Sequence, residues 1–177
     1  MNEPLNNLIA ALREELTQYG EVLALMQEQQ ELIINRAANE LLLNLNSVNE
    51  QMEKVAAARG AREAARAQLV QTVGGTPEMT FRQMTDELPE EVRPLLEALV
   101  EEINQMLQRI QKWLRQNHML LKRSLDLMQK IMQGMFPSAG GVAGTYGRGG
   151  QVSPVTPPPS TLYEGCLLYT SPSPRDG

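Results

Sequence analysis

Residues 5–26 read LNNLIAALREELTQYGEVLALM, and this stretch decides the fold. Its apolar residues recur at alternating steps of three and four, which is the spacing of one face of an α-helix. The same spacing continues to Val73 without a proline, and Gly74-Gly75 suits a helix end. The pattern therefore predicts one helix from about residue 5 to residue 73, roughly 100 Å long.

Two irregularities mark this predicted helix. Successive steps of four interrupt the heptad spacing at Ala37, Leu41 and Leu45. We expect the supercoil to straighten there. Polar residues also occupy positions in the apolar stripe, the line of apolar residues along one face of the helix, and this predicts a weaker coil. They are Gln30, Arg59 and Arg62.

A second long apolar stripe follows a linker. Thr80 and Gln83 have the spacing of a capping box, so the linker, residues 76–88, is predicted to contain a short helix. The second stripe starts near residue 90 and stops at Gly134. Each stripe needs a partner, and the nearest one is covalently attached. The sequence therefore predicts an all-α fold, a long antiparallel helical hairpin with coiled-coil character.

Composition divides the chain into three segments. Residues 1–136 carry the helical pattern and form the predicted domain. Residues 137–165 are rich in Gly and Pro without apolar periodicity, so we expect a disordered tail. Residues 166–177 read CLLYTSPSPRDG and resemble a translated sequencing adapter. We expect this last segment to be an artefact whose removal changes neither stability nor binding.

Composition also excludes several functions. The 177 residues include 16 Lys and Arg against 21 Asp and Glu, and the net charge of −5 argues against a nucleic-acid partner. One His and one Cys are too few for most zinc sites and catalytic triads. We therefore expect no enzyme activity, no catalytic or metal-binding residue and no cofactor. No apolar run approaches the roughly 20 residues that a membrane span needs, and the first residues do not have the pattern of a signal peptide. We therefore expect a cytoplasmic protein without membrane insertion.

The predicted hairpin leaves part of its first helix unpaired. A partner of about 45 residues covers only about 70 Å of a helix of about 100 Å, which places Met135 near residues 26–30. The first apolar residues then lack an internal partner, as is typical of a protein interface. We expect the two helix ends to supply the partner-binding residues Leu12, Leu16, Tyr19, Leu121, Leu125, Met128, Met132 and Met135.

Asn117 interrupts the second apolar stripe. A buried amide in a coil usually fixes register, so Asn117 is a candidate register residue, and a side chain directed into solvent is the alternative. Methionines crowd the same helix. They would let a surface adapt to different partners, and core filling is the alternative interpretation.

Several motifs follow one another in a fixed order. Residues 8–19, LIAALREELTQY, precede VNEQM at 48–52, NHMLLKRSL at 117–125 and TYGRGG at 145–150. Together they resemble the FlgN family of flagellar export chaperones over roughly residues 5–151. Members of that family usually have two successive Asn or Gln residues shortly before the position of Asn117. This chain has Trp113 and Leu114 there. This departure concerns the fine register of the client-binding helix.

The resemblance implies an all-helical, ATP-independent chaperone. Such a chaperone binds hook-filament junction proteins of the FlgK and FlgL type in the bacterial cytoplasm and prevents their premature assembly. It also delivers them to the export gate, whose components are further expected partners. An alternative from another class is a structural coiled-coil scaffold protein that homodimerises through its N-terminal apolar stripe.

Overall fold

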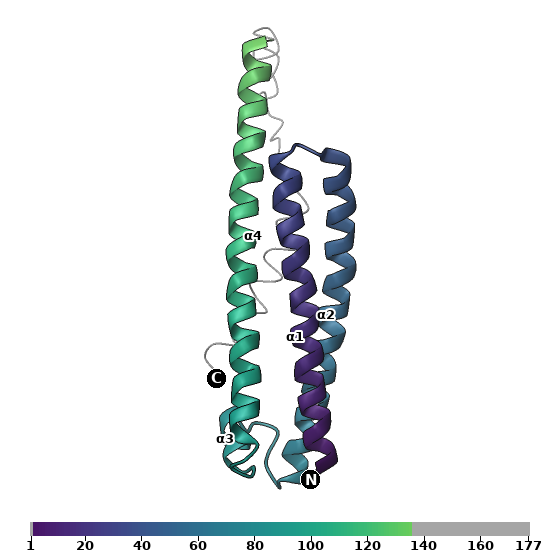
Figure 1. Ribbon diagram of the computed structural model, residues 1–177, viewed down its shortest axis with the longest axis vertical. Coiled ribbons are helices and arrows are strands. Elements are labelled where there is room, and N and C mark those ends of the chain that lie inside the picture. The colour runs from purple at the N-terminus through teal and green to yellow at the C-terminus, as the bar shows by residue number, and fades with distance from the viewer. Residues whose placement is uncertain (1, 136–177) are drawn as a thin grey trace, which may run out of the picture.

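α-Helices account for most of residues 2–135, the part of the chain that the computed structural model describes (Figure 1). The predicted all-α class, with long helices and a short intervening one, is confirmed. The predicted tail at 137–165 and the adapter-like segment at 166–177 lie outside the described residues. The helices are α1 (Asn2–Ile34), α2 (Ala38–Thr72), α3 (Phe81–Asp86) and α4 (Arg93–Met135).

The predicted single first helix is wrong, because the chain leaves the helix at residues 35–37 and reverses. Arg36 has a left-handed backbone with φ of 55°. Its N–H donates to the Ile33 carbonyl, and the Ala37 N–H donates to the Leu32 carbonyl, which is the Schellman pattern of a helix end. The irregular spacing that begins at Ala37 therefore accompanies a turn, where a straightened coil was expected.

Two other predicted helix ends are confirmed. Gly74 has φ of 73°, and the Gly75 N–H donates to the Val70 carbonyl in the same Schellman pattern. At the start of α3, the Gln83 N–H donates to Thr80 Oγ1 at 3.2 Å, and the Thr80 N–H donates to Gln83 Oε1 at 2.9 Å. These two bonds form the predicted capping box.

α4 begins at Arg93, a few residues later than the sequence predicts. The Arg93 side chain donates to the carbonyls of Leu88 and Asp86, at 2.9 and 2.7 Å. It therefore binds one carbonyl at the end of α3 and one just beyond it, at a helix end where carbonyls have no partner within the helix. These bonds fix the start of α4 against the linker.

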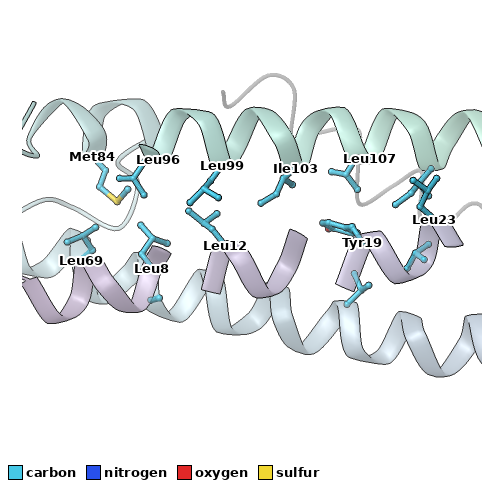
Figure 2. Packing of buried hydrophobic residues seen from close by; sticks show 14 of the residues in the cluster. Leu8, Leu12, Tyr19, Leu23, Leu69, Met84, Leu96, Leu99, Ile103 and Leu107 are labelled. Carbon is cyan, nitrogen blue, oxygen red and sulfur yellow. The ribbon is translucent and has the colours of Figure 1, made fainter. Parts of the chain in front are cut away.

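α1 packs against both α2 and α4 (Figure 1). Two reversals of the chain make α1 antiparallel to α2 and parallel to α4. The antiparallel hairpin is thus formed by α1 and α2, both within the stretch expected to be one helix, and α4 is a third long helix. In Figure 2, Leu8 and Leu12 of α1 point toward Leu96 and Leu99 of α4.

The core runs along the bundle between the three long helices. At the end of the bundle near α3, shown at the left of Figure 2, Leu8 and Leu69 are fully buried together with Leu96 of α4 and Met84 of α3. Each such side chain contributes about 1.5 to 3 kcal/mol by leaving water. Met84 therefore holds the short α3 against the ends of the long helices.

Candidate functional site

α4 is longer than the helices that it packs against. It has 43 residues, compared with 33 in α1 and 35 in α2. Because α4 is parallel to α1, its C-terminal end projects past the turn between α1 and α2 (Figure 1). Asn117 is hydrogen-bonded to Met26 and Gln29, so α1 ends close to the level of residue 122. We call residues 122–135 the α4 extension, which is about 20 Å long.

One face of the α4 extension is apolar and exposed. Its residues recur at steps of three and four and continue the face through which α4 packs on α1. Their exposed fractions run from 47% to 68%. Contiguous exposed apolar surface of this kind marks an interaction site. The face is formed by Leu125, Met128, Ile131, Met132 and Met135.

The structure brings together only the α4 half of the predicted groove. Leu12 and Tyr19 are buried in the core, and Leu16 is half-buried against it. Because α1 runs parallel to α4, this part of α1 lies beside the first half of α4 and away from its end. Leu121 is half-buried at the base of the extension. The remaining predicted residues lie on the extension: Leu125, Met128, Met132 and Met135.

The N-terminal apolar stripe, which the sequence suggested was free, is covered within the bundle. Leu8 and Leu12 are at most 1% exposed, and Leu5 is also buried. The scaffold alternative required this stripe as a dimer interface. The structure therefore contradicts the premise of that alternative.

Sequence reasoning missed a second exposed apolar group at the turn between α1 and α2. Ile34, Leu42 and Leu43 are each more than 60% exposed, and we call them the apolar tip. They lie at the end of the bundle past which the α4 extension projects (Figure 1). The signal for them was the run of three leucines at 41–43, because consecutive residues cannot all face one side of a helix.

Asn117 connects the long helices just below the extension. Its Nδ2 donates to the Met26 carbonyl at 2.8 Å and to Gln29 Oε1 at 3.1 Å, while Gln29 Nε2 donates to Asn44 Oδ1 of α2 at 3.3 Å. The Asn117 side chain is fully buried, so the solvent-facing alternative is wrong. Its Oδ1 has no hydrogen-bond partner among the described residues. That Asn117 sets the register remains a prediction.

A buried ion pair connects α1 and α2 farther down the bundle. Glu15 is 1% exposed, and its two carboxylate oxygens lie 3.1 and 3.0 Å from Nη1 of Arg62. Burial raises the pKa of the Glu15 carboxyl, and the Arg62 charge and a hydrogen bond with Tyr19 oppose this rise. Burial also raises the pKa of the Tyr19 hydroxyl. The polar seam position predicted at Arg62 is therefore an interhelical ion pair.

A cavity of about 210 Å³ lies beside this ion pair, between α2 and α4. Tyr19, Val55, Leu107 and Leu114 are among its lining side chains, and each is at most 8% exposed. A helix with its side chains is about 10 Å across and needs an open groove. α2 and α4 pack mainly on α1, and Ala56, Gly60 and Glu63 in the cavity lining are exposed, so the cavity opens to solvent between α2 and α4. Its volume is too small for a whole partner helix.

Residues 2–135 contain neither a cluster of metal ligands nor a membrane-spanning helix. No three His, Cys, Asp or Glu side chains in that range are placed to hold a metal ion. None of the helices in the same range is both long enough and apolar enough to cross a membrane.

A bundle of long helices with an exposed amphipathic extension places the chain among all-helical proteins with a candidate surface for binding other proteins. The chain belongs to the FlgN family: the family model described as FlgN protein matches residues 1–154. This is a family of flagellar export chaperones, which bind flagellar proteins and are not enzymes. No curated protein and no solved structure matches the chain.

Proposed function

We propose that this protein is a cytoplasmic chaperone for hook-filament junction proteins, which it keeps from premature assembly and helps to deliver to the export gate. Family membership supports the export-chaperone part of the proposal. The α4 extension is the observation that supports a client site. It carries six of the eleven large apolar side chains that are exposed among the described residues, so exposed apolar surface is concentrated there.

The physical chemistry of the α4 extension favours a helical client. A helical segment as short as the α4 extension is only marginally stable in water when its apolar face packs against nothing, because most helices are stabilised by packing of that face. A client helix laid along the extension would bury that face and its own apolar face together. The unbranched methionine side chains can adapt to more than one client sequence. Binding of this kind needs neither ATP nor a cofactor.

The same contact would account for the chaperone effect. A client segment whose apolar face lies against the extension cannot use that face to assemble with other subunits. Premature assembly is then prevented by occupancy alone. Leu125 and Met128 start this surface near the bundle, and Met132 and Met135 continue it toward the end of α4.

The test compares two double variants of the full chain. Met128→Asn/Met132→Asn makes the apolar face polar, whereas Gln129→Asn/Gln133→Asn makes similar changes on the polar face of the same helix. Neither variant alters the net charge. Binding of the C-terminal segment of a junction protein is measured by isothermal titration calorimetry, with circular dichroism as the check on helix content.

We expect the methionine variant to bind at least about tenfold more weakly, since two large apolar contacts are lost, and the glutamine variant to bind as the native chain does. Both variants should keep the native helix content. Equal binding by the methionine variant and the native chain would place the client site elsewhere and overturn the proposal.

A further inference from the structure

The α4 extension is cationic in a chain that is acidic overall. It contains Lys122, Arg123 and Lys130 against Asp126, while the chain has a formal net charge of −5. All four side chains are exposed. Arg123 and Lys130 are seven residues apart and so lie along one line of the helix, and Lys122 lies on the other side of the polar face. Positive charge therefore accompanies the apolar face along the extension.

These cations form no ion pair with any residue of the described range 2–135. Ion pairs in that range join Arg62 and Arg66 to Glu15 and Glu63. Arg109 and Lys112 in the first half of α4 likewise form no ion pair with a residue of that range. Exposed charges contribute little to stability even when they are paired, and the three cations of the extension are not paired within the described range. They therefore have no evident structural role in the described bundle. Their field can act on a partner that approaches the extension.

We propose that the α4 extension selects an amphipathic helix with acidic residues flanking its apolar face. This inference rests on the proposed function and specifies the chemistry of the client segment. Apolar contact with Leu125, Met128 and Met132 supplies affinity, while Lys122 and Arg123 attract carboxylates on the client's flanks. Electrostatic complementarity of this kind mainly raises the association rate and discriminates between partners.

A second copy of the chain fits this surface poorly. Two extensions laid side by side would bring together six cations and two anions, and like charges in close proximity oppose association.

An anionic lipid surface fits the amphipathic pattern less well than a protein partner does. Helices that lie on membranes commonly carry Trp, Phe or Leu on their apolar face, whereas the apolar face of the extension consists of one Leu, one Ile and three Met residues. Methionine is instead common on surfaces that adapt to varied protein partners. The family also binds flagellar proteins.

The test uses the full chain and two designed helical peptides of about 18 residues. The peptides share one Leu-rich apolar face and differ only in their flanks, which are Glu in one and Lys in the other. Binding is measured by fluorescence anisotropy at about 50 mM and about 500 mM salt, because screening separates electrostatic from apolar contributions. The matched variant is Lys122→Glu/Arg123→Glu/Lys130→Glu, which reverses the charge without touching the apolar face.

We expect the native chain to bind the acidic peptide about tenfold more tightly than the basic peptide at low salt, with the ratio shrinking at high salt. The charge-reversed variant should prefer the basic peptide. Equal binding of both peptides, or binding of neither, would overturn the inference. Co-sedimentation of the native chain with phosphatidylserine vesicles but not with phosphatidylcholine vesicles, if lost in the variant, would assign the cations to lipid and also overturn it.

Binding of the junction-protein segment separates this inference from the proposed function. If the charge-reversed variant binds that segment with native affinity and native salt dependence, the charge inference fails while the client site stands. If the Met128→Asn/Met132→Asn variant binds it with native affinity, the proposed client site itself fails.

Discussion

The side-chain amide of Asn117 donates a 2.8 Å hydrogen bond to the main-chain carbonyl of Met26, at the level where α4 begins to leave the bundle. The bond joins two parallel helices that are 91 residues apart in sequence. It lies directly below the α4 extension, so it can fix how far α4 projects past the end of α1. Asn117 thus connects the packing of the core to the geometry of the candidate site.

Replacing Asn117 by Asp should lower the free energy of unfolding by about 2 to 4 kcal/mol at pH 7. The amide donor is lost, and a carboxylate would face the Met26 carbonyl and Gln29 Oε1, neither of which can donate to it. Urea unfolding measures the change. Asn49→Asp, at an exposed position on α2, is the matched control and should change stability by less than about 0.5 kcal/mol. Equal effects of the two substitutions would show that burial of the Asn117 amide does not matter.

Arg36→Gly should raise the free energy of unfolding by about 1 kcal/mol. Arg36 has φ of 55°, and this left-handed conformation costs a residue with a Cβ about 1 to 2 kcal/mol. Glycine avoids this cost, but part of the gain is offset because glycine loses more conformational entropy on folding. Asn35→Gly is the control, because residue 35 has no positive φ and should gain nothing. A fall in the urea midpoint of Arg36→Gly would indicate that the turn does not have this conformation in solution.

Glu15 should make the stability of the protein depend on pH. Burial raises the pKa of its carboxyl above the ordinary value of 4.5. As the pH rises, the folded state therefore keeps this proton to a higher pH than the unfolded state does. Stability associated with this group is therefore fully present below pH 4.5 and is lost as the pH rises through the raised pKa. The native chain should lose stability relative to Glu15→Gln over this range.

Urea unfolding of both chains between about pH 4 and pH 7 measures this difference. Glu53→Gln, on the exposed side of α2, is compared in the same way to remove general effects of charge. If the difference between Glu15→Gln and the native chain does not change with pH, the Glu15 carboxyl has the same affinity for protons in the folded and unfolded states.

Leu99→Ala should cost about 2 to 4 kcal/mol, the usual effect of a large-to-small change in a packed core. Leu99 is 7% exposed and points toward Leu12 of α1 (Figure 2). Leu42→Ala removes the same atoms from the apolar tip, where the side chain is 62% exposed, and should leave the urea midpoint nearly unchanged. Similar losses in both variants would mean that the apolar tip is packed in solution, against a second copy for example.

The sequence was sufficient to predict the features of this fold that depend on local chemistry. Gly74 ends α2 and the Thr80 and Gln83 pair caps α3, because these residue types bind the free groups at helix ends. The turn at Arg36 could not be predicted in the same way, because a residue with a Cβ occupies the left-handed position and no glycine or proline marks it.

Missing that turn also changed the predicted site. A continuous first helix would be antiparallel to the last one, which would leave Leu12 and Tyr19 free beside Met135. With a turn at Arg36, α1 is parallel to α4 and those two side chains are buried. The apolar spacing from Leu125 onward is a local property of α4, so the sequence could predict an apolar face there, and the structure leaves that face exposed. Binding of a partner to this face remains a prediction.

Ending the chain after Arg123 should abolish binding of the junction-protein segment and leave the bundle intact. From residue 125 to residue 135 every side chain is exposed, so their removal deletes no core contact. Asn117, its hydrogen bonds to α1 and the buried residues of α4 all remain. The truncated chain should therefore keep the urea midpoint of the intact chain, while its loss of helical circular dichroism should match only the residues removed.

A second truncation, after Met135, is the matched control for this experiment, because it keeps the α4 extension and removes everything that follows it. Calorimetry should detect the junction-protein segment binding to this longer chain with native affinity and show no binding to the shorter one. Because both chains lack the same C-terminal residues, the difference between them isolates residues 124–135. Native affinity in the shorter chain would show that clients bind the bundle itself, and the α4 extension would then need another explanation.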